Sequence, residues 1–164
     1  MTTMTATTIT PTELTPVQQI MKRWKMNRNA LLELVALLPE SGGGWRPWEG
    51  GMTTIELVHH LAATPDFFFS AIEEREMLVP PVPPTLAETR ELLLRLTAEH
   101  EQKLASYAES ELREPATIAL LNVTEPIAEI LHRLIGHEAH HKGQLFVYAR
   151  MLGVTPPFYV DVTV

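Results

Sequence analysis

Apolar side chains recur every three or four residues along four long stretches of the chain, which is the spacing of one face of an α-helix. Each stretch opens on a threonine, and the first and last end at Pro39 and Gly153, residues that commonly terminate helices. Between the stretches the apolar spacing is lost, and proline and glycine become frequent. We therefore predict four helices, over residues 15–38, 53–72, 85–104 and 124–152.

The starts of the helices are marked by capping patterns. Thr15 is followed by a proline, which is favoured in the first helical turn. Thr53 and Thr85 are each followed three residues later by a glutamate, the pattern of a capping box. Pro65 lies inside the second stretch, where it predicts a kink or a break.

The segments between the helices are long. Residues 41–44 (SGGG) predict a loop, and residues 80–84 (PPVPP) predict an extended connector. Residues 117–121 could form a short extended piece, but a lone strand cannot make a sheet. The expected fold is therefore all-α, a four-helix bundle with long inter-helix loops.

The chain of 164 residues fits one domain, and 45% apolar residues suffice for an ordinary core. We expect residues 1–12 to be a disordered Thr-rich tail and residues 13–164 to be the domain. No apolar run approaches the roughly 20 residues that span a bilayer. The N-terminus also lacks the pattern of a secretory signal, so the expected location is cytoplasmic.

Cysteine content and charge remove several classes of function. The chain has no cysteine, which excludes disulfides, thiolate metal sites and cysteine nucleophiles. A formal charge of -7 disfavours binding to nucleic acid. Any metal ion must then be held by histidine or by oxygen ligands.

Histidine is the residue type that suggests a function. Four of the seven histidines lie between residues 132 and 141, and two are adjacent at residues 59 and 60. His137 and His141 are four residues apart, so a helix presents both imidazoles on one face. They continue the apolar stripe of their helix, which places them in the interior, where bundles build metal sites.

The third ligand would come from His59 or His60 on the second helix. Adjacent helical residues point about 100° apart, so only one of them can face the site. Periodicity alone leaves the choice open. His100, His132 and His140 fall off the apolar stripes and are expected at the surface or rim.

Residues 137–141 (HEAHH) also match H-E-x-x-H, the zinc-protease pattern in which the glutamate is a general base. That pattern is short, and no further histidine follows it. Glu138 would also lie about 100° from His137. A peptidase is therefore only a minor alternative.

Three segments resemble the DinB-like (DNA-damage-inducible) metalloprotein superfamily. Residues 141–145 (HKGQL) and 148–157 (YARMLGVTPP) are similar to the family's closing motifs, and residues 45–61 are similar to its "WxP…S/T-xxEL…HL" segment. The resemblance extends from about residue 17 to residue 158. It implies a four-helix bundle, often a homodimer, with three histidines on nickel, zinc or a similar divalent transition metal.

By the same resemblance the ligands are His60, His137 and His141. Characterised relatives include transferases that use low-molecular-weight thiols and a maleylpyruvate isomerase. The resemblance thus implies an enzyme whose metal activates water or a small thiol against a small-molecule electrophile, as a thiol S-transferase or a hydrolase. The alternative is a metal-stabilised, non-catalytic binding or stress protein.

Catalytic residues are not identified by these patterns. The candidates are Glu56, Glu138 and Gln144, each of which has a structural explanation of similar weight. Glu56 belongs to a capping box, and Gln144 could hydrogen-bond a ligand or substrate from the face that carries His141.

Overall fold

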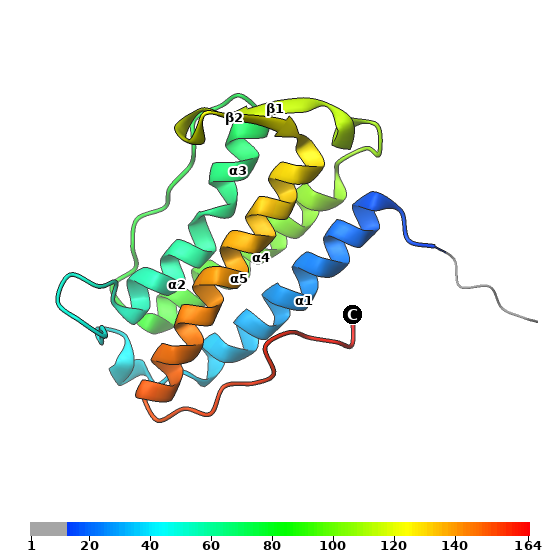
Figure 1. Cartoon of the computed structure of the whole chain (residues 1–164). Helices are drawn as coiled ribbons and strands as arrows, with labels where there is room; N and C mark the ends of the chain where they lie inside the picture. Colours follow the sequence, from blue (N-terminus) through cyan, green and yellow to red (C-terminus); the bar gives the residue numbers. More distant parts are fainter. Residues whose placement is uncertain (1–12) are drawn as a thin grey trace, which may run out of the picture.

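The computed structural model describes residues 13–164, which are mostly helical (Figure 1). The predicted tail, residues 1–12, lies outside the described part. No helix within residues 13–164 is both long and apolar enough to cross a membrane. The elements are α1 (Pro16–Leu37), α2 (Thr54–Ala63), α3 (Pro65–Ile72), α4 (Leu86–Ala105), β1 (Pro115–Ile118), β2 (Val123–Pro126) and α5 (Ile127–Met151), with short 3-10 turns at Glu40–Gly42, Glu111–Arg113 and Ala119–Leu121.

The predicted helix starts are confirmed at α1, α2 and α4. Thr15 and Thr53 each form a full capping box. The threonine hydroxyl accepts the backbone N–H of the residue three positions later, and the side chain of that residue accepts the threonine's backbone N–H. Thr85 accepts the N–H of Glu88 and so caps α4. These bonds satisfy amides that a helix start leaves without partners.

Pro65 breaks the second predicted helix into α2 and α3, as its position suggested. Thr64 between them keeps helical angles (φ -64°, ψ -26°), so α3 continues nearly in line with α2. A proline has no N–H to give to the carbonyl four residues earlier, here that of Leu61. The Arg28 guanidinium of α1 lies 3.5 Å from this carbonyl oxygen and replaces the missing donor.

A two-stranded hairpin was not predicted, and it corrects the all-α expectation. β1 pairs antiparallel with β2, with Thr117 opposite Thr124. The reversal is made by the 3-10 turn and by Asn122, whose φ of 51° is left-handed. Because Thr124 and Pro126 belong to β2, α5 begins at Ile127 rather than near Thr124.

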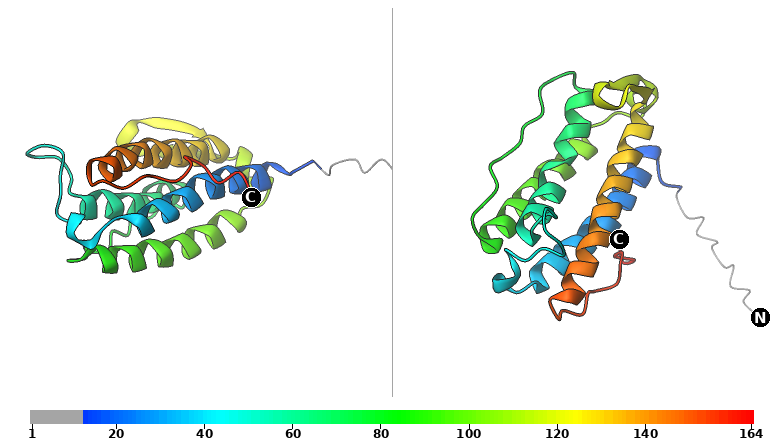
Figure 2. Two further views of the ribbon diagram at one scale, coloured as in Figure 1. Left: turned by 90° about the horizontal axis from the view of Figure 1, so that it is seen from below. Right: turned by 60° about the vertical axis from the view of Figure 1, so that its left-hand side comes forward.

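The long helices pack side by side, with α1 and α2 each contacting both α4 and α5. Their apolar faces form two clusters of buried side chains, one near the α2 end of the molecule and one near the hairpin. The segment after α5 runs back along α1 (Figures 1 and 2), where the Asp161 amide donates to the Met26 carbonyl.

Phe67, Phe68 and Phe69 form an apolar run that could serve as a contact surface in a dimer. Phe68 and Phe69 are 5% and 2% exposed and belong to the core, so this run offers little surface to a second copy. Dimerisation stays a prediction from the family resemblance.

Candidate metal centre

Three imidazoles from two helices meet at one point. His60 lies on α2, and His137 and His141 lie one turn apart on α5. One ring nitrogen of each falls within 4.8 Å of the others. The Nε2 atoms of His60 and His137 are 3.2 Å apart. All three side chains are half-buried, so the cluster is partly shielded from water.

The opposite nitrogen of two of these rings is held by a side chain one turn or less away. His141 Nδ1 lies 2.7 Å from Gln144 Oε1, and His60 Nδ1 lies 3.2 Å from the Thr64 hydroxyl. An amide oxygen only accepts, so His141 Nδ1 donates and Nε2 presents its lone pair. The Thr64 hydroxyl can accept from His60 in the same way. This is the arrangement that orients histidine ligands in metal sites.

The electrostatics favour neutral rings. Burial, together with the neighbouring His141 and His59, lowers the pKa of His60 to about 4. Burial likewise lowers the pKa of His137 to about 4, helped by the nearby histidines. Both rings are therefore unprotonated at neutral pH and can bind a cation without first losing a proton.

His59, the competing candidate, faces away from the cluster. Its Nε2 lies 2.8 Å from the Pro80 carbonyl oxygen, in the connector between α3 and α4. Because adjacent helical residues diverge by about 100°, a ring that reaches the connector cannot also reach α5. The geometry therefore brings together the three residues that the family resemblance named.

The remaining histidines divide between surface and interior. His140 is exposed and His132 is half-buried, in keeping with their expected places. His100 was expected at the surface, and that prediction was wrong, because it is only 5% exposed. Its ring packs on Phe69, with the ring centres 5.5 Å apart.

Two of the three catalytic candidates are engaged elsewhere. Glu138 is 2% exposed, and both of its oxygens accept from the Arg28 guanidinium. Glu56 is exposed and accepts the Thr53 backbone N–H at 2.6 Å, and these bonds to Thr53 lower its pKa. Glu138 is therefore occupied by Arg28 through both oxygens, whereas Glu56 has one oxygen engaged in the cap of α2. Gln144, the third candidate, holds His141.

Lys142 was not singled out from the sequence, yet it is 3% exposed. Its ammonium donates to Asn27 Oδ1 at 2.8 Å and to the Tyr159 carbonyl, so it ties α5 to α1 and to the C-terminal segment. Burial lowers its pKa to about 8. No local pattern marks a lysine for burial, because the partners come from distant parts of the chain.

Comparisons with known proteins agree with this fold. The model of the DinB superfamily matches residues 23–145. An uncharacterised protein of Bacillus subtilis (strain 168), YjoA, is 29% identical over 148 residues, covering 86% of this chain and 94% of its own.

Two solved structures resemble the chain throughout. The crystal structure of YjoA, described as a DinB-like protein, has a TM-score of 0.73 at 25% identity and covers 87% of this chain and 99% of its own. A DinB-like protein from Bacillus cereus ATCC 10987 has a TM-score of 0.75 at 18% identity, with coverages of 84% and 93%, which shows a shared fold. Since the family model spans well over half of the sequence, the chain belongs to the DinB superfamily.

Proposed function

We propose that the protein binds one divalent transition-metal ion, zinc or nickel, through His60, His137 and His141. The observation that carries this proposal is the convergence of three ring nitrogens within 4.8 Å. Imidazole nitrogens are a donor set that such ions prefer, and the far nitrogens of two of these rings are held by hydrogen bonds. Without a cation, the Nε2 atoms of His60 and His137, 3.2 Å apart, are compensated only when one of the two carries a proton.

We further propose that the site is catalytic in type. Structural zinc sites are closed by four protein ligands, whereas catalytic sites use three and keep a position for water or substrate. Within residues 13–164, the metal-competent group has three members. When bound, the ion would supply Lewis acidity, which lowers the pKa of a coordinated water or thiol.

The side chains around the site would then orient the metal ligands. Gln144 and Thr64 hold two of the ligand rings, and Phe68 lies against His137 with the ring centres 5.9 Å apart. The ion pair of Glu138 with Arg28 anchors α5 between the two ligands that α5 carries. Because Glu138 is paired with Arg28 and Glu56 belongs to the cap of α2, the site suits a nucleophile that is activated by the metal rather than by a glutamate base.

The proposed reaction is the attack of a small thiol or of water on a small-molecule electrophile, of the thiol S-transferase or hydrolase type. Support for the thiol rests on the family resemblance. The second candidate is a metal-stabilised protein without turnover, which shares the same site and differs only in the outcome of an activity screen.

The first test is elemental analysis of untagged protein. About one metal ion per chain is expected, and His60→Ala, His137→Ala and His141→Ala should each lose it. His59→Ala and His132→Ala are matched controls that should keep it, because neither ring belongs to the cluster. Wild-type protein that takes up neither zinc nor nickel would overturn the proposal.

Metal-loaded protein would then be screened with thiols plus an electrophile and with small esters. Turnover that disappears in the three ligand variants supports the enzyme. Turnover that survives in metal-free protein contradicts it. A metal-dependent rise in melting temperature with no turnover in either screen favours the non-catalytic alternative.

A further inference from the structure

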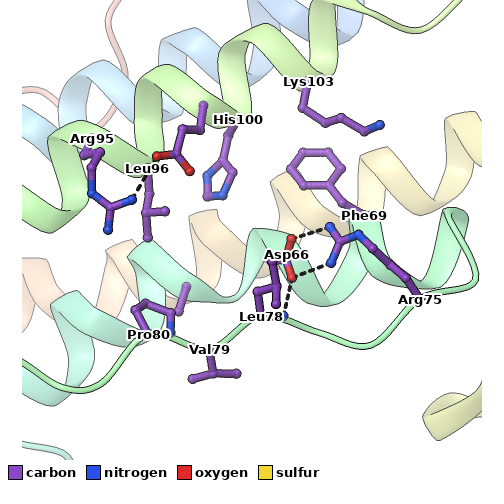
Figure 3. A pocket seen from close by; sticks show the side chains of 12 residues that line it. Asp66, Phe69, Arg75, Leu78, Val79, Pro80, Arg95, Leu96, His100 and Lys103 are labelled. Carbon is purple, nitrogen blue, oxygen red and sulfur yellow. Dashed lines mark hydrogen bonds and ion pairs between the residues drawn. The ribbon is translucent and has the colours of Figure 1, made fainter.

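A hollow lies on a different face of α3 from the one that packs against the three-histidine cluster. It has a volume of about 430 Å³ and lies between α4 and the α2–α3 pair (Figure 3). Its outer wall is the α3–α4 connector, here residues 73–85, which contributes Leu78, Val79 and Pro80. The size is within the range of small-molecule sites in proteins.

His100 supplies the unsatisfied polar group of this hollow. Its side chain reaches from α4 into the space above α3 (Figure 3) and is 5% exposed. Nδ1 is buried and has no hydrogen-bond partner among the described residues. Buried polar atoms in native proteins nearly always have a partner, so an orphaned nitrogen at a cavity indicates a missing one.

The imidazole is neutral. Burial lowers the pKa of His100 to about 3, and the charge of Arg28 acts in the same direction. A neutral ring has one N–H donor and one bare nitrogen. Its natural partner is an uncharged group that can both donate and accept, such as a hydroxyl.

The charged residues around the hollow are already paired with one another. Arg75 donates to Asp66 at 2.9 Å and Arg95 to Glu99 at 2.8 Å. Lys103 is paired with Glu73. The other lining side chains are apolar, namely Ala63, Phe69, Leu78, Val79, Pro80 and Leu96. No charge is left over to attract an ionic ligand.

The outer wall is fastened at two points. The Leu78 backbone N–H donates to Asp66 at 2.6 Å, and His59 Nε2 lies 2.8 Å from the Pro80 carbonyl oxygen. Asp66 thus holds both Arg75 and the connector (Figure 3). Two hydrogen bonds with side chains of α2 and α3 therefore fix the position of the connector that forms this wall.

Adjacent residues on α3 separate the two sites. Phe68 packs on His137 of the metal cluster, whereas Phe69 packs on His100. Because these side chains diverge by about 100° on the helix, a molecule beside His100 has α3 between it and the three histidines.

We propose that this hollow is a second ligand site, independent of the metal, for an uncharged molecule with an apolar body and one hydroxyl group, such as a phenol. The hydroxyl would bind the free nitrogen of His100, and the apolar body would lie on Phe69, Leu96 and the connector. This proposal goes beyond the proposed function and does not depend on it.

The test uses the full-length protein with phenol and toluene, which differ by one hydrogen-bonding group. Phenol is expected to bind more tightly and to shift the imidazole ¹⁵N resonances of His100. In His100→Phe, which keeps a ring but removes both nitrogens, phenol affinity should fall about three- to tenfold and equal that of toluene. His137→Ala should bind phenol as wild type does.

Several results would overturn the proposal. They are the absence of phenol binding to wild type at millimolar concentration, an unchanged His100 resonance in the presence of bound phenol, and phenol binding that is lost with the metal in His137→Ala. The resonance shift is measured in wild type, so the test still decides if His100→Phe fails to fold. Failure of the metal proposal would leave these outcomes unchanged.

Discussion

His59 and His60 show how one residue step changes the chemistry open to a side chain. His60 points toward α5 and joins His137, whereas His59 points toward the connector and donates from Nε2 to the Pro80 carbonyl oxygen. The two rings diverge by about 100° because both lie in one helical turn. The doublet therefore contacts the connector and the metal cluster from two different faces of α2.

Gln144 and Thr64 act on the metal centre only through the rings that they hold. Gln144→Leu and Thr64→Val remove the hydrogen bonds to His141 and His60 while keeping side-chain size close to that of wild type. We expect each change to weaken metal affinity about 10- to 100-fold, because ring orientation and basicity are lost. Competition titration against a chromogenic chelator measures this.

The matched control for Gln144→Leu is Gln102→Leu, at an exposed glutamine of α4. It should leave metal affinity unchanged. If Gln144→Leu and Thr64→Val also bind metal as tightly as wild type, packing alone positions the ligand rings.

At the scale of the elements, α2 and α3 form one nearly continuous rod that is interrupted at Pro65, here called the joint. At the joint the Leu61 carbonyl has no helical N–H donor, and Arg28 of α1 donates to it instead. The rod carries His60 before the joint and Phe68 and Phe69 after it, so both sites depend on how this rod is placed. Its start is set by the capping box at Thr53.

Removing that capping box should destabilise the protein without touching either site. In the structure the Glu56 backbone N–H donates to the Thr53 hydroxyl at 3.1 Å, and Thr53→Ala removes this acceptor. The expected loss in free energy of unfolding is about 1 kcal/mol, measured by urea denaturation of metal-free protein. Thr155→Ala, at an exposed threonine outside any helix, should change stability by less than about 0.5 kcal/mol. Equal effects of the two changes would argue against the cap.

At the scale of the whole molecule, one guanidinium connects the four long elements. Arg28 of α1 is fully buried and donates to Glu138 of α5 at 3.1 Å and to Thr97 of α4 at 3.2 Å. It also reaches the α2 carbonyl of Leu61 and stacks over Trp24, 5.2 Å from the ring centre. The geometry of a planar five-donor group suits such a junction.

Breaking this junction on one side should be far worse than removing it entirely. Arg28→Met leaves the Glu138 carboxylate buried and uncompensated, at an expected cost of about 3–5 kcal/mol in free energy of unfolding. The double variant Arg28→Met/Glu138→Leu should recover much of that loss, because no charge remains buried. Urea denaturation in the presence of a chelator checks both. Additive losses in the double variant would contradict a direct pairing.

Much of the fold could be predicted from the chain because helix starts and stops are local. Thr15, Thr53 and Thr85 cap the amides within their own next turn, and Pro65 acts on a carbonyl four residues away. The hairpin escaped prediction because each strand has only four residues and gains stability only from its partner. Its omission also misplaced the start of α5 by three residues.

The sequence by itself determined the helical segments and the pairing of His137 with His141, since both follow from the geometry of a single helix. Only the tertiary structure decided between His59 and His60, because that choice depends on where α5 and the connector lie. It also decided that Glu138 pairs with Arg28 and that His100 is buried beside a hollow. Those outcomes rest on contacts between residues more than 20 positions apart, which no local periodicity encodes.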